Sequence, residues 1–140
     1  MKTSRYLILS LMVFCAVTVQ AQNQIETNQW MRTELYFGRS IPSGGKVSNA
    51  AWRKFVKTHV TPAFPEGSSV IDAKGQWRDS KTGKTISERS KVLVVLYKQQ
   101  DQEATNQALE KVADAYIKQF HQQSVMRVDQ LAKTIFYPVE

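Results

Sequence analysis

Cysteine and histidine are scarce in this chain of 140 residues, and their scarcity excludes several kinds of chemistry. The one cysteine, Cys15, lies in an apolar stretch near the N-terminus, so the rest of the chain can form no disulfide and offers no thiol for redox chemistry. The two histidines, His59 and His121, do not belong to a paired spacing such as His-x-x-x-His. We therefore expect no metal site and no cofactor, and we expect His59 to be a packed, hydrogen-bonded core residue.

Long basic runs are also missing, although the formal net charge is +7. Proteins that bind nucleic acid concentrate such charges in one patch, commonly with aromatic residues among them. Here the cations are scattered over a predicted helix and a predicted turn, at Arg53, Lys54, Lys57, Lys81 and Lys84. We therefore expect a solvated, mildly cationic surface and no nucleic-acid partner, while weak attraction to anionic envelope polymers stays open.

Complete catalytic motifs are missing too. The triplet "KTG" at residues 81–83 occurs in serine β-lactamases beside a Ser-Asp-Asn element, which this chain lacks. "SGGK" at residues 43–46 has neither the spacing nor the following Ser or Thr of a phosphate-binding loop. Both segments are better explained as turns that contain glycine, so the motifs predict no reaction.

A targeting segment is expected at the N-terminus. "MKTSR" gives a basic start, the run from Tyr6 to Val19 is mostly apolar, and Val19 and Ala21 are small residues that a signal peptidase accepts. We expect residues 1–21 to be a signal peptide cleaved after Ala21, because the apolar run is shorter than the ~20 residues of a membrane-spanning helix. The bulky residue before Cys15 argues against a lipoprotein. The expected location is the periplasm or the outside of the cell, without a transmembrane anchor.

The remainder is predicted to be a flexible polar leader, residues 22–29, and one α+β domain, residues 30–140. In "WMRTELYFG", residues 30–38, apolar or β-branched residues alternate with polar ones, which predicts a half-buried strand. Its two faces would carry Thr33, Leu35 and Phe37 on one side and Arg32, Glu34 and Tyr36 on the other.

Two amphipathic helices are expected in this domain. Ser48 is a suitable N-cap for the first, which should end near Val60 because Pro62 removes an interior amide. The second has the clearer pattern, with apolar residues at i, i+3, i+4 and i+7. The stripes expected to be buried are Trp52, Phe55, Val56 and His59 in the first helix, and Leu109, Val112, Ala113, Tyr116, Ile117 and Phe120 in the second.

Three further strands are expected, at residues 69–77, 91–97 and 124–128, with residues 134–137 as a candidate fifth strand. "DSKTGK" joins the first two as a hairpin turn, with its tip at residues 81–84. The strand at 91–97 is apolar on both faces, so it should be central in the sheet and covered on both sides.

The order strand–helix–strand–strand–helix–strand predicts a ferredoxin-like two-layer α+β sandwich, in which two helices pack on one face of an antiparallel sheet. This layout leaves the other face of the sheet open. Because monomers seldom expose a large apolar patch to water, we expect a second subunit, a ligand or the C-terminal tail to cover it. A homodimer through this face is the expected assembly.

A set of polar and aromatic residues is the candidate ligand site, because its members are predicted at strand ends or near one sheet face. Arginine forks pair with carboxylates, and Trp or Tyr offers a flat apolar wall. The alternative is that the same residues form surface ion pairs, such as one across the hairpin, and an aromatic dimer contact. The set consists of Glu34, Tyr36, Arg39, Trp77, Arg78, Glu88, Lys91, Gln123 and Arg127.

Four segments carry a resemblance when they are taken together and in order. They are "RTELYFGRSIPSGGKVSNAAWRKFVKTHVTPAFPEG", "DAKGQWRD", "ERSKVLVVLY" and "QQSVMRVD", within residues 32–129. This order of motifs resembles the bacterial family known as domain of unknown function 3574. The resemblance implies a small exported protein, and it implies no established activity, cofactor or catalytic residue.

Two functions stay open from the sequence. The first hypothesis is an exported, non-catalytic binding or accessory protein, whose ligand is a small molecule or an anionic envelope component. The second is a small cofactor-free enzyme resembling the dimeric α/β-barrel group, in which a Tyr, Glu or Arg handles protons. A pocket lined by Tyr36, Trp77 and Arg127 would favour the second hypothesis, and a filled sheet face would favour an interaction protein.

Overall fold

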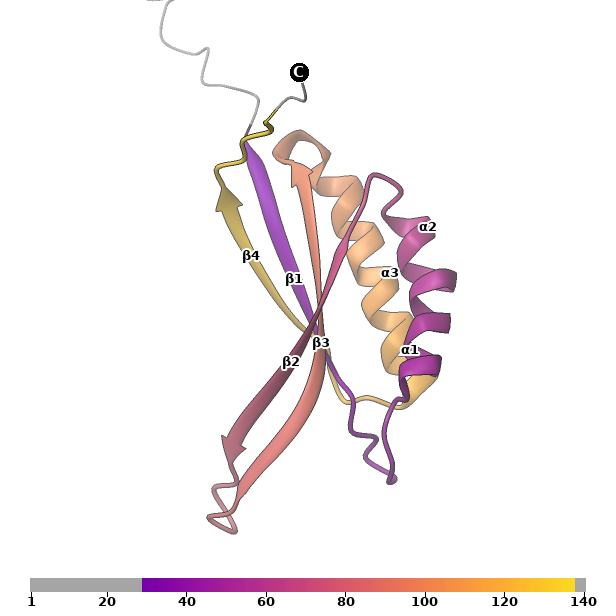
Figure 1. Ribbon diagram of the computed structural model, residues 1–140, viewed down its shortest axis with the longest axis vertical. Coiled ribbons are helices and arrows are strands. Elements are labelled where there is room, and N and C mark those ends of the chain that lie inside the picture. The colour runs from indigo at the N-terminus through magenta and orange to yellow at the C-terminus, as the bar shows by residue number, and fades with distance from the viewer. Residues whose placement is uncertain (1–28, 138–140) are drawn as a thin grey trace, which may run out of the picture.

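The computed structural model describes residues 29–137, and the predicted signal peptide lies outside them. Within this part, the helices cover one face of a four-stranded antiparallel sheet (Figure 1). The α+β prediction is confirmed, and the order of elements is compatible with the predicted ferredoxin-like layout. The strands follow the order β2-β3-β1-β4, where β1 is Trp30–Gly38, β2 is Ser69–Arg78, β3 is Thr85–Lys98 and β4 is Met126–Ala132.

β1 forms where the alternating sequence predicted it. Neighbouring side chains of a strand point to opposite faces, and buried residues alternate with partly exposed ones along β1. Leu35 and Phe37, on the buried side, are 2% and 0% exposed and pack beneath the helices. The other side carries Arg32, Glu34 and Tyr36, as the alternation predicted.

α1, Asn49–Phe55, also begins at the predicted position. The hydroxyl of Ser48 accepts a hydrogen bond from the backbone N–H of Ala51 at 3.1 Å, which satisfies one of the amides left free at a helix start. Trp52 and Phe55 are buried, so the predicted stripe faces the sheet over this helix.

The helix continues further than the sequence predicted. A π-helical turn, Val56–Val60, is followed by the short α2, Thr61–Ala63. The predicted end is wrong because the wide turn places Pro62 within the first turn of a new helical segment, where its missing N–H costs little. His59 is partly buried rather than enclosed in the core, and its ring centroid lies 5.0 Å from that of Phe55.

α3 shows the stripe that its pattern predicted. A 3₁₀ turn, Gln99–Asp101, leads into α3, Gln102–Phe120. His121 then adopts a left-handed conformation with φ of 52°, and the N–H of Gln122 donates to the carbonyl of Ile117 at 3.1 Å, which closes the helix end. The residues of α3 that are buried against the sheet are Leu109, Val112, Tyr116 and Phe120.

Tyr116 is the centre of the core between the two layers. Its ring meets those of Phe37 and Phe55 edge-on, at centroid distances of 4.7 and 5.2 Å, an arrangement that aromatic quadrupoles favour. The buried hydroxyl donates a hydrogen bond to the carbonyl of Gly38 at 2.8 Å, so burial leaves it satisfied. Burial raises the pKa of Tyr116 to about 12. This side chain therefore ties α3 to the end of β1.

Three strand boundaries differ from the prediction. β3 begins at Thr85 rather than at residue 91, because its ladder with β2 continues to the pair Arg78–Thr85 next to the turn. β4 begins at Met126 and runs on to Ala132, since it pairs along nearly the whole of β1. Residues 133–137 form no strand. The polar stretch around the turn is therefore strand as well as loop.

The β2–β3 hairpin reaches well beyond the helical layer (Figure 1). Its turn is built as predicted: Asp79 accepts hydrogen bonds from the N–H groups of Lys81 and Thr82, at 2.7 and 3.1 Å. These two bonds lower the pKa of the Asp79 carboxyl. Gly83 supplies the positive φ, 67°, that the turn requires. We call residues 73–90 the arm.

Candidate functional site

The face of the sheet opposite the helices, the open face, is defined by the strand register. Residues directly opposite one another on neighbouring strands share a face. Arg32, Glu34 and Tyr36 of β1 pair with alternate residues of β3 and of β4, and these pairs set the middle of the open face. Around them lie Val92, Val94 and Leu96 of β3, Ile71 of β2, and Met126 and Val128 of β4, and Trp77 lies on the same face further along β2.

A hydrogen-bonded network occupies the middle of this face. The guanidinium of Arg32 donates from Nε and Nη2 to Oε1 of Glu34, at 2.9 and 2.7 Å. The hydroxyl of Tyr36 donates to the other carboxylate oxygen of Glu34. The side chains of Arg32 and Glu34 are 31% and 18% exposed, so the network is partly desolvated. All three residues come from one strand, and alternation alone aligns them.

The network fixes the protonation states of its members. The hydrogen bond from Tyr36, and then the hydrogen bonds from Arg32, lower the pKa of the Glu34 carboxyl. The same bond to Glu34 raises the pKa of the Tyr36 phenol, because it stabilises the protonated form. Glu34 is therefore ionised and Tyr36 neutral at pH 7. Tyr36 can donate or accept a hydrogen bond, but it is a poor base.

Apolar side chains surround the network and remain partly in contact with water. Val92 and Val94, next to the network on the central strand, are only 5% and 6% exposed. Further out, Leu96 is 43%, Met126 56% and Val128 40% exposed. Single exposed apolar residues are ordinary, whereas several on one sheet face form a patch of the kind found at interfaces and ligand sites. β3 was expected to be covered on both sides, and this expectation is wrong at Leu96 on the open face.

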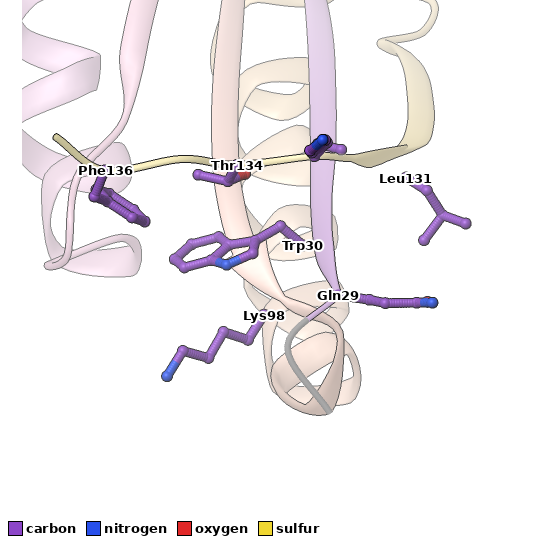
Figure 2. A pocket seen from close by; sticks show the side chains of 8 residues that line it. Gln29, Trp30, Lys98, Leu131, Thr134 and Phe136 are labelled. Carbon is purple, nitrogen blue, oxygen red and sulfur yellow. The ribbon is translucent and has the colours of Figure 1, made fainter. Parts of the chain in front are cut away.

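The C-terminal segment covers one end of the open face. After β4 the chain crosses in front of β1 and β3, on the side away from α3 (Figure 2). The rings of Trp30 and Phe136 approach to a centroid distance of 5.5 Å. A groove open to solvent lies here, between the crossing segment and the strand ends. It is lined by Gln29, Trp30, Lys98, Leu131, Ala132, Lys133, Thr134 and Phe136.

Four of the nine predicted site residues lie on the open face, and only Glu34 and Tyr36 among them are in contact. Glu34 and Tyr36 belong to the network. Trp77 is on the arm, opposite Ile86, about 20 Å along β3 from the partner of Tyr36. Glu88 accepts a hydrogen bond from the N–H of Ser40 at 3.0 Å and does not pair with Arg78, contrary to the predicted cross-hairpin pair.

Three of the predicted site residues belong to the helix-side face of the sheet. Arg78 donates to the carbonyl of Gly83 in the turn at 3.1 Å. The buried Lys91 forms an ion pair with Asp72 of β2, which lowers the pKa of that carboxyl. Arg127 donates hydrogen bonds to Asp129 of its own strand and to Asn106 of α3. A pocket lined jointly by Tyr36, Trp77 and Arg127 is therefore absent, because register places Arg127 on the opposite face from Tyr36.

The remaining two candidates lie in connections. Arg39, which follows β1, is 8% exposed, and its guanidinium donates twice to the carbonyl of Val47, at 2.8 and 2.6 Å. It holds the loop after β1 against the start of the first helix. Gln123 is exposed in the link between α3 and β4, and its neighbour Gln122 donates to the carbonyl of Ser40 at 2.9 Å.

Sequence reasoning missed a second polar network, on the helix side of β4. Asp129 accepts hydrogen bonds from Thr33 and from Nε of Arg127, the latter at 3.0 Å. Arg127 also donates to Asn106 of α3 at 2.6 Å, and the hydroxyl of Tyr97 lies 3.2 Å from that of Thr33. The sequence gives no local signal for it, because its members come from four elements. Arg32 was missed too, although it shares the alternation of Glu34 and Tyr36.

Within residues 29–137, no group of three or more His, Cys, Asp or Glu residues is placed to hold a metal ion. In the same part of the chain, no helix is long and apolar enough to cross a membrane.

Comparison with known proteins gives a family and a fold. The model of the family described as "Protein of unknown function (DUF3574)" matches residues 32–136. Among solved structures, a phage SAM lyase in complex with S-methyl-5'-thioadenosine is similar, with a TM-score of 0.56 and 11% identity over 79% of this chain and 87% of that one. A phage SAM lyase in the apo state gives a TM-score of 0.52 and 13% identity over 85% and 100% of the two chains. At these identities the likeness shows the fold alone. No curated protein matches the sequence.

Proposed function

The chain belongs to the DUF3574 family, which brings no activity with it, and we propose that it is an exported binding protein that acts as a homodimer through its open face. The proposal rests on one observation: a hydrogen-bonded polar network lies in the middle of that face, and partly exposed apolar side chains surround it. Two such faces brought together would enclose Arg32, Glu34 and Tyr36 in an apolar chamber.

The apolar surround supports the dimer. Leu96, Met126 and Val128 are each at least 40% exposed, and burial of one such side chain contributes roughly 1–3 kcal/mol. Symmetric dimers are the commonest soluble oligomers, and they use the same patch on both subunits. As far as residue 137, the C-terminal segment lies at the Trp30 end of the open face and leaves the middle and the β4 side available.

The polar network supports a ligand with a hydrogen-bond acceptor. Glu34 already accepts three hydrogen bonds, so its carboxylate has little capacity left for a ligand. A guanidinium has five N–H donors, of which Arg32 uses two on Glu34. The chamber would therefore select a small, mostly apolar molecule that carries a carbonyl or a carboxylate for Arg32. Export is proposed from the signal-like pattern of residues 1–21.

The test is sedimentation velocity on the protein and on two matched variants. Val128→Lys places a charge on the open face, and Val70→Lys places one at a residue of similar exposure, 41%, on the helix-side face of β2. We expect a dimer for the protein and for Val70→Lys, and a monomer for Val128→Lys. A monomer at every concentration for the unaltered protein would overturn the dimer. Native mass spectrometry of the dimer should then reveal a bound small molecule that is lost in Arg32→Met.

The second candidate is a cofactor-free enzyme, and the likeness to phage SAM lyases favours it as the alternative. A neutral Tyr36 held by Glu34 could hydrogen-bond a substrate and position it for bond cleavage. If this function holds, incubation with S-adenosylmethionine should release S-methyl-5'-thioadenosine, detected by liquid chromatography. The sulfonium sulfur takes the electron pair of the broken C–S bond and leaves as a neutral thioether without a proton, and the substrate's own carboxylate can take its place on the carbon. Tyr36 would therefore act by positioning the substrate, and Tyr36→Phe would lower the rate about tenfold or more. Absence of product would leave the binding function as the conclusion.

A further inference from the structure

The arm carries an unbalanced positive charge. Residues 73–90 contain five cations and two carboxylates, a net charge of +3. Both carboxylates are occupied by backbone amides: Asp79 caps the turn, and Glu88 accepts from the N–H of Ser40. The five cations are Lys74, Arg78, Lys81, Lys84 and Arg89. All of them are exposed, and none forms an ion pair with a carboxylate of the described residues.

Two large apolar side chains lie directly behind the charged tip. Trp77 and Ile86 face each other across the hairpin and are 53% and 37% exposed. Their neighbours along β2 on the same face of the arm, Gly75 and Ala73, are small, and among the described residues both side chains stay partly open to solvent. A partner that covers this pair would remove its apolar surface from water, which is favourable.

The shape of the arm makes its tip accessible to a flat surface. The hairpin projects past the end of the helical layer, so its tip lies away from the helices (Figure 1). The turn is closed by paired backbone hydrogen bonds, Asp79 to the carbonyl of Lys84 at 2.9 Å and Gly83 to the carbonyl of Asp79 at 2.8 Å. The tip is therefore a formed structure with lysines on its outside.

We propose that the arm docks the protein on an anionic phospholipid surface. Lys81 and Lys84 would lie among the headgroups, and Trp77 with Ile86 would enter the interfacial region. Tryptophan is favoured at this depth because its ring is apolar and its N–H finds polar partners. Each lysine near an anionic surface strengthens binding about fivefold, so charge and insertion act together. Such docking is peripheral and needs no spanning helix.

A lipid surface fits the tip better than a dissolved polyanion does. Single-stranded nucleic acid is held by several stacked aromatic side chains, whereas the arm offers Trp77 alone. Ile86 gains nothing from a polyanion in water, but it gains from contact with acyl chains. The Trp77–Ile86 pair is therefore the feature that decides between the two kinds of partner.

The test is co-sedimentation of the purified protein with two kinds of vesicle, phosphatidylcholine alone and phosphatidylcholine mixed with phosphatidylglycerol. We expect binding to the mixed vesicles that weakens with salt, and little binding to phosphatidylcholine alone. Lys81→Gln/Lys84→Gln should weaken binding about 25-fold, which is two lysines at about fivefold each. Trp77→Ser should weaken it about tenfold or more, as loss of a buried large apolar side chain does.

The matched control keeps the total charge equal. Lys54 and Lys57 are exposed on the helical stretch, away from the arm, so Lys54→Gln/Lys57→Gln lowers the net charge by the same amount. This variant should bind the mixed vesicles nearly as well as the unaltered protein. Circular dichroism establishes that each variant is folded, and Trp77→Ser should remain so because Trp77 lies outside the core.

Three results would overturn the proposal. The first is an equal loss of binding in the arm double variant and in the control, which would mean that overall charge alone drives attraction. The second is full binding by Trp77→Ser, or equal affinity for single-stranded DNA, which would identify a general polyanion contact. The third is no binding to either kind of vesicle at low salt.

Discussion

The two faces of the sheet differ in how completely the chain covers them. On the helix side, Leu35, Leu93 and Tyr116 are at most 2% exposed, and the aromatic rings interlock. On the open side, Leu96 and Val128 of the same sheet are at least 40% exposed around a polar network. Within residues 29–137, the helix side is covered over its centre, although Val70 near its edge stays 41% exposed, and the open side keeps exposed apolar side chains.

The largest expected difference between the faces comes from one substitution made on each. Leu109→Ala on α3 removes a side chain that is 1% exposed, and Leu96→Ala removes one that is 43% exposed. The first should lower the free energy of unfolding by about 2–5 kcal/mol, and the second by less than about 1 kcal/mol in the monomer. Urea unfolding measures both. Similar losses at the two sites would show that the faces are equally packed.

A smaller effect is expected at the buried hydroxyl of the helix side. Tyr116→Phe removes the bond to Gly38 and should cost about 0.5–1.5 kcal/mol at pH 7. The raised pKa of Tyr116, about 12 against the ordinary 10.0, means that the unfolded chain releases this proton first as the pH rises. Its contribution is therefore complete below pH 10 and is lost as the pH climbs towards 12. The free energy of unfolding of Tyr116→Phe should therefore fall less between pH 10 and pH 12 than that of the unaltered protein. Identical pH dependence of the two proteins in urea unfolding would contradict the raised pKa of Tyr116.

The smallest effect is expected from the network on the open face. The lowered pKa of Glu34 means that, on acidification, the unfolded chain takes up this proton before the folded chain does. Its contribution to stability is therefore present above the ordinary value of 4.5 and is lost as the pH falls through the lower folded value. Glu34→Gln should lose less stability between pH 7 and pH 3 than the unaltered protein. An equal loss in urea unfolding would mean that the network does not hold Glu34.

Local patterns in the sequence predicted the covered half of the molecule well. The alternation of β1, the Ser48 cap and the stripe of α3 each depend on neighbours within a few residues, and all three are confirmed. The late helix end at Ala63 was missed because a π-helical turn leaves no mark in composition. The extended β3 was missed because polar residues near a turn resemble a loop.

The candidate site was only partly predictable for a different reason. Glu34 and Tyr36 share a strand, so alternation placed them together. Arg127 and Trp77 depend on the register between strands, and a shift of one residue moves a side chain to the other face. Register is a property of the folded sheet rather than of any short segment. The proposed ligand site is therefore restricted to the network of β1.

Thiol labelling can decide whether a second copy covers the open face, as we propose. The only cysteine, Cys15, falls within the predicted signal peptide, so a single introduced cysteine reports on one position of the processed chain. Val128 and Val70 are 40% and 41% exposed in the single chain, on opposite faces of the sheet. We predict that Val70→Cys reacts with a maleimide at a constant rate, and that Val128→Cys is protected at high protein concentration and becomes reactive on dilution. Equal rates for the two variants at every concentration would contradict the claim.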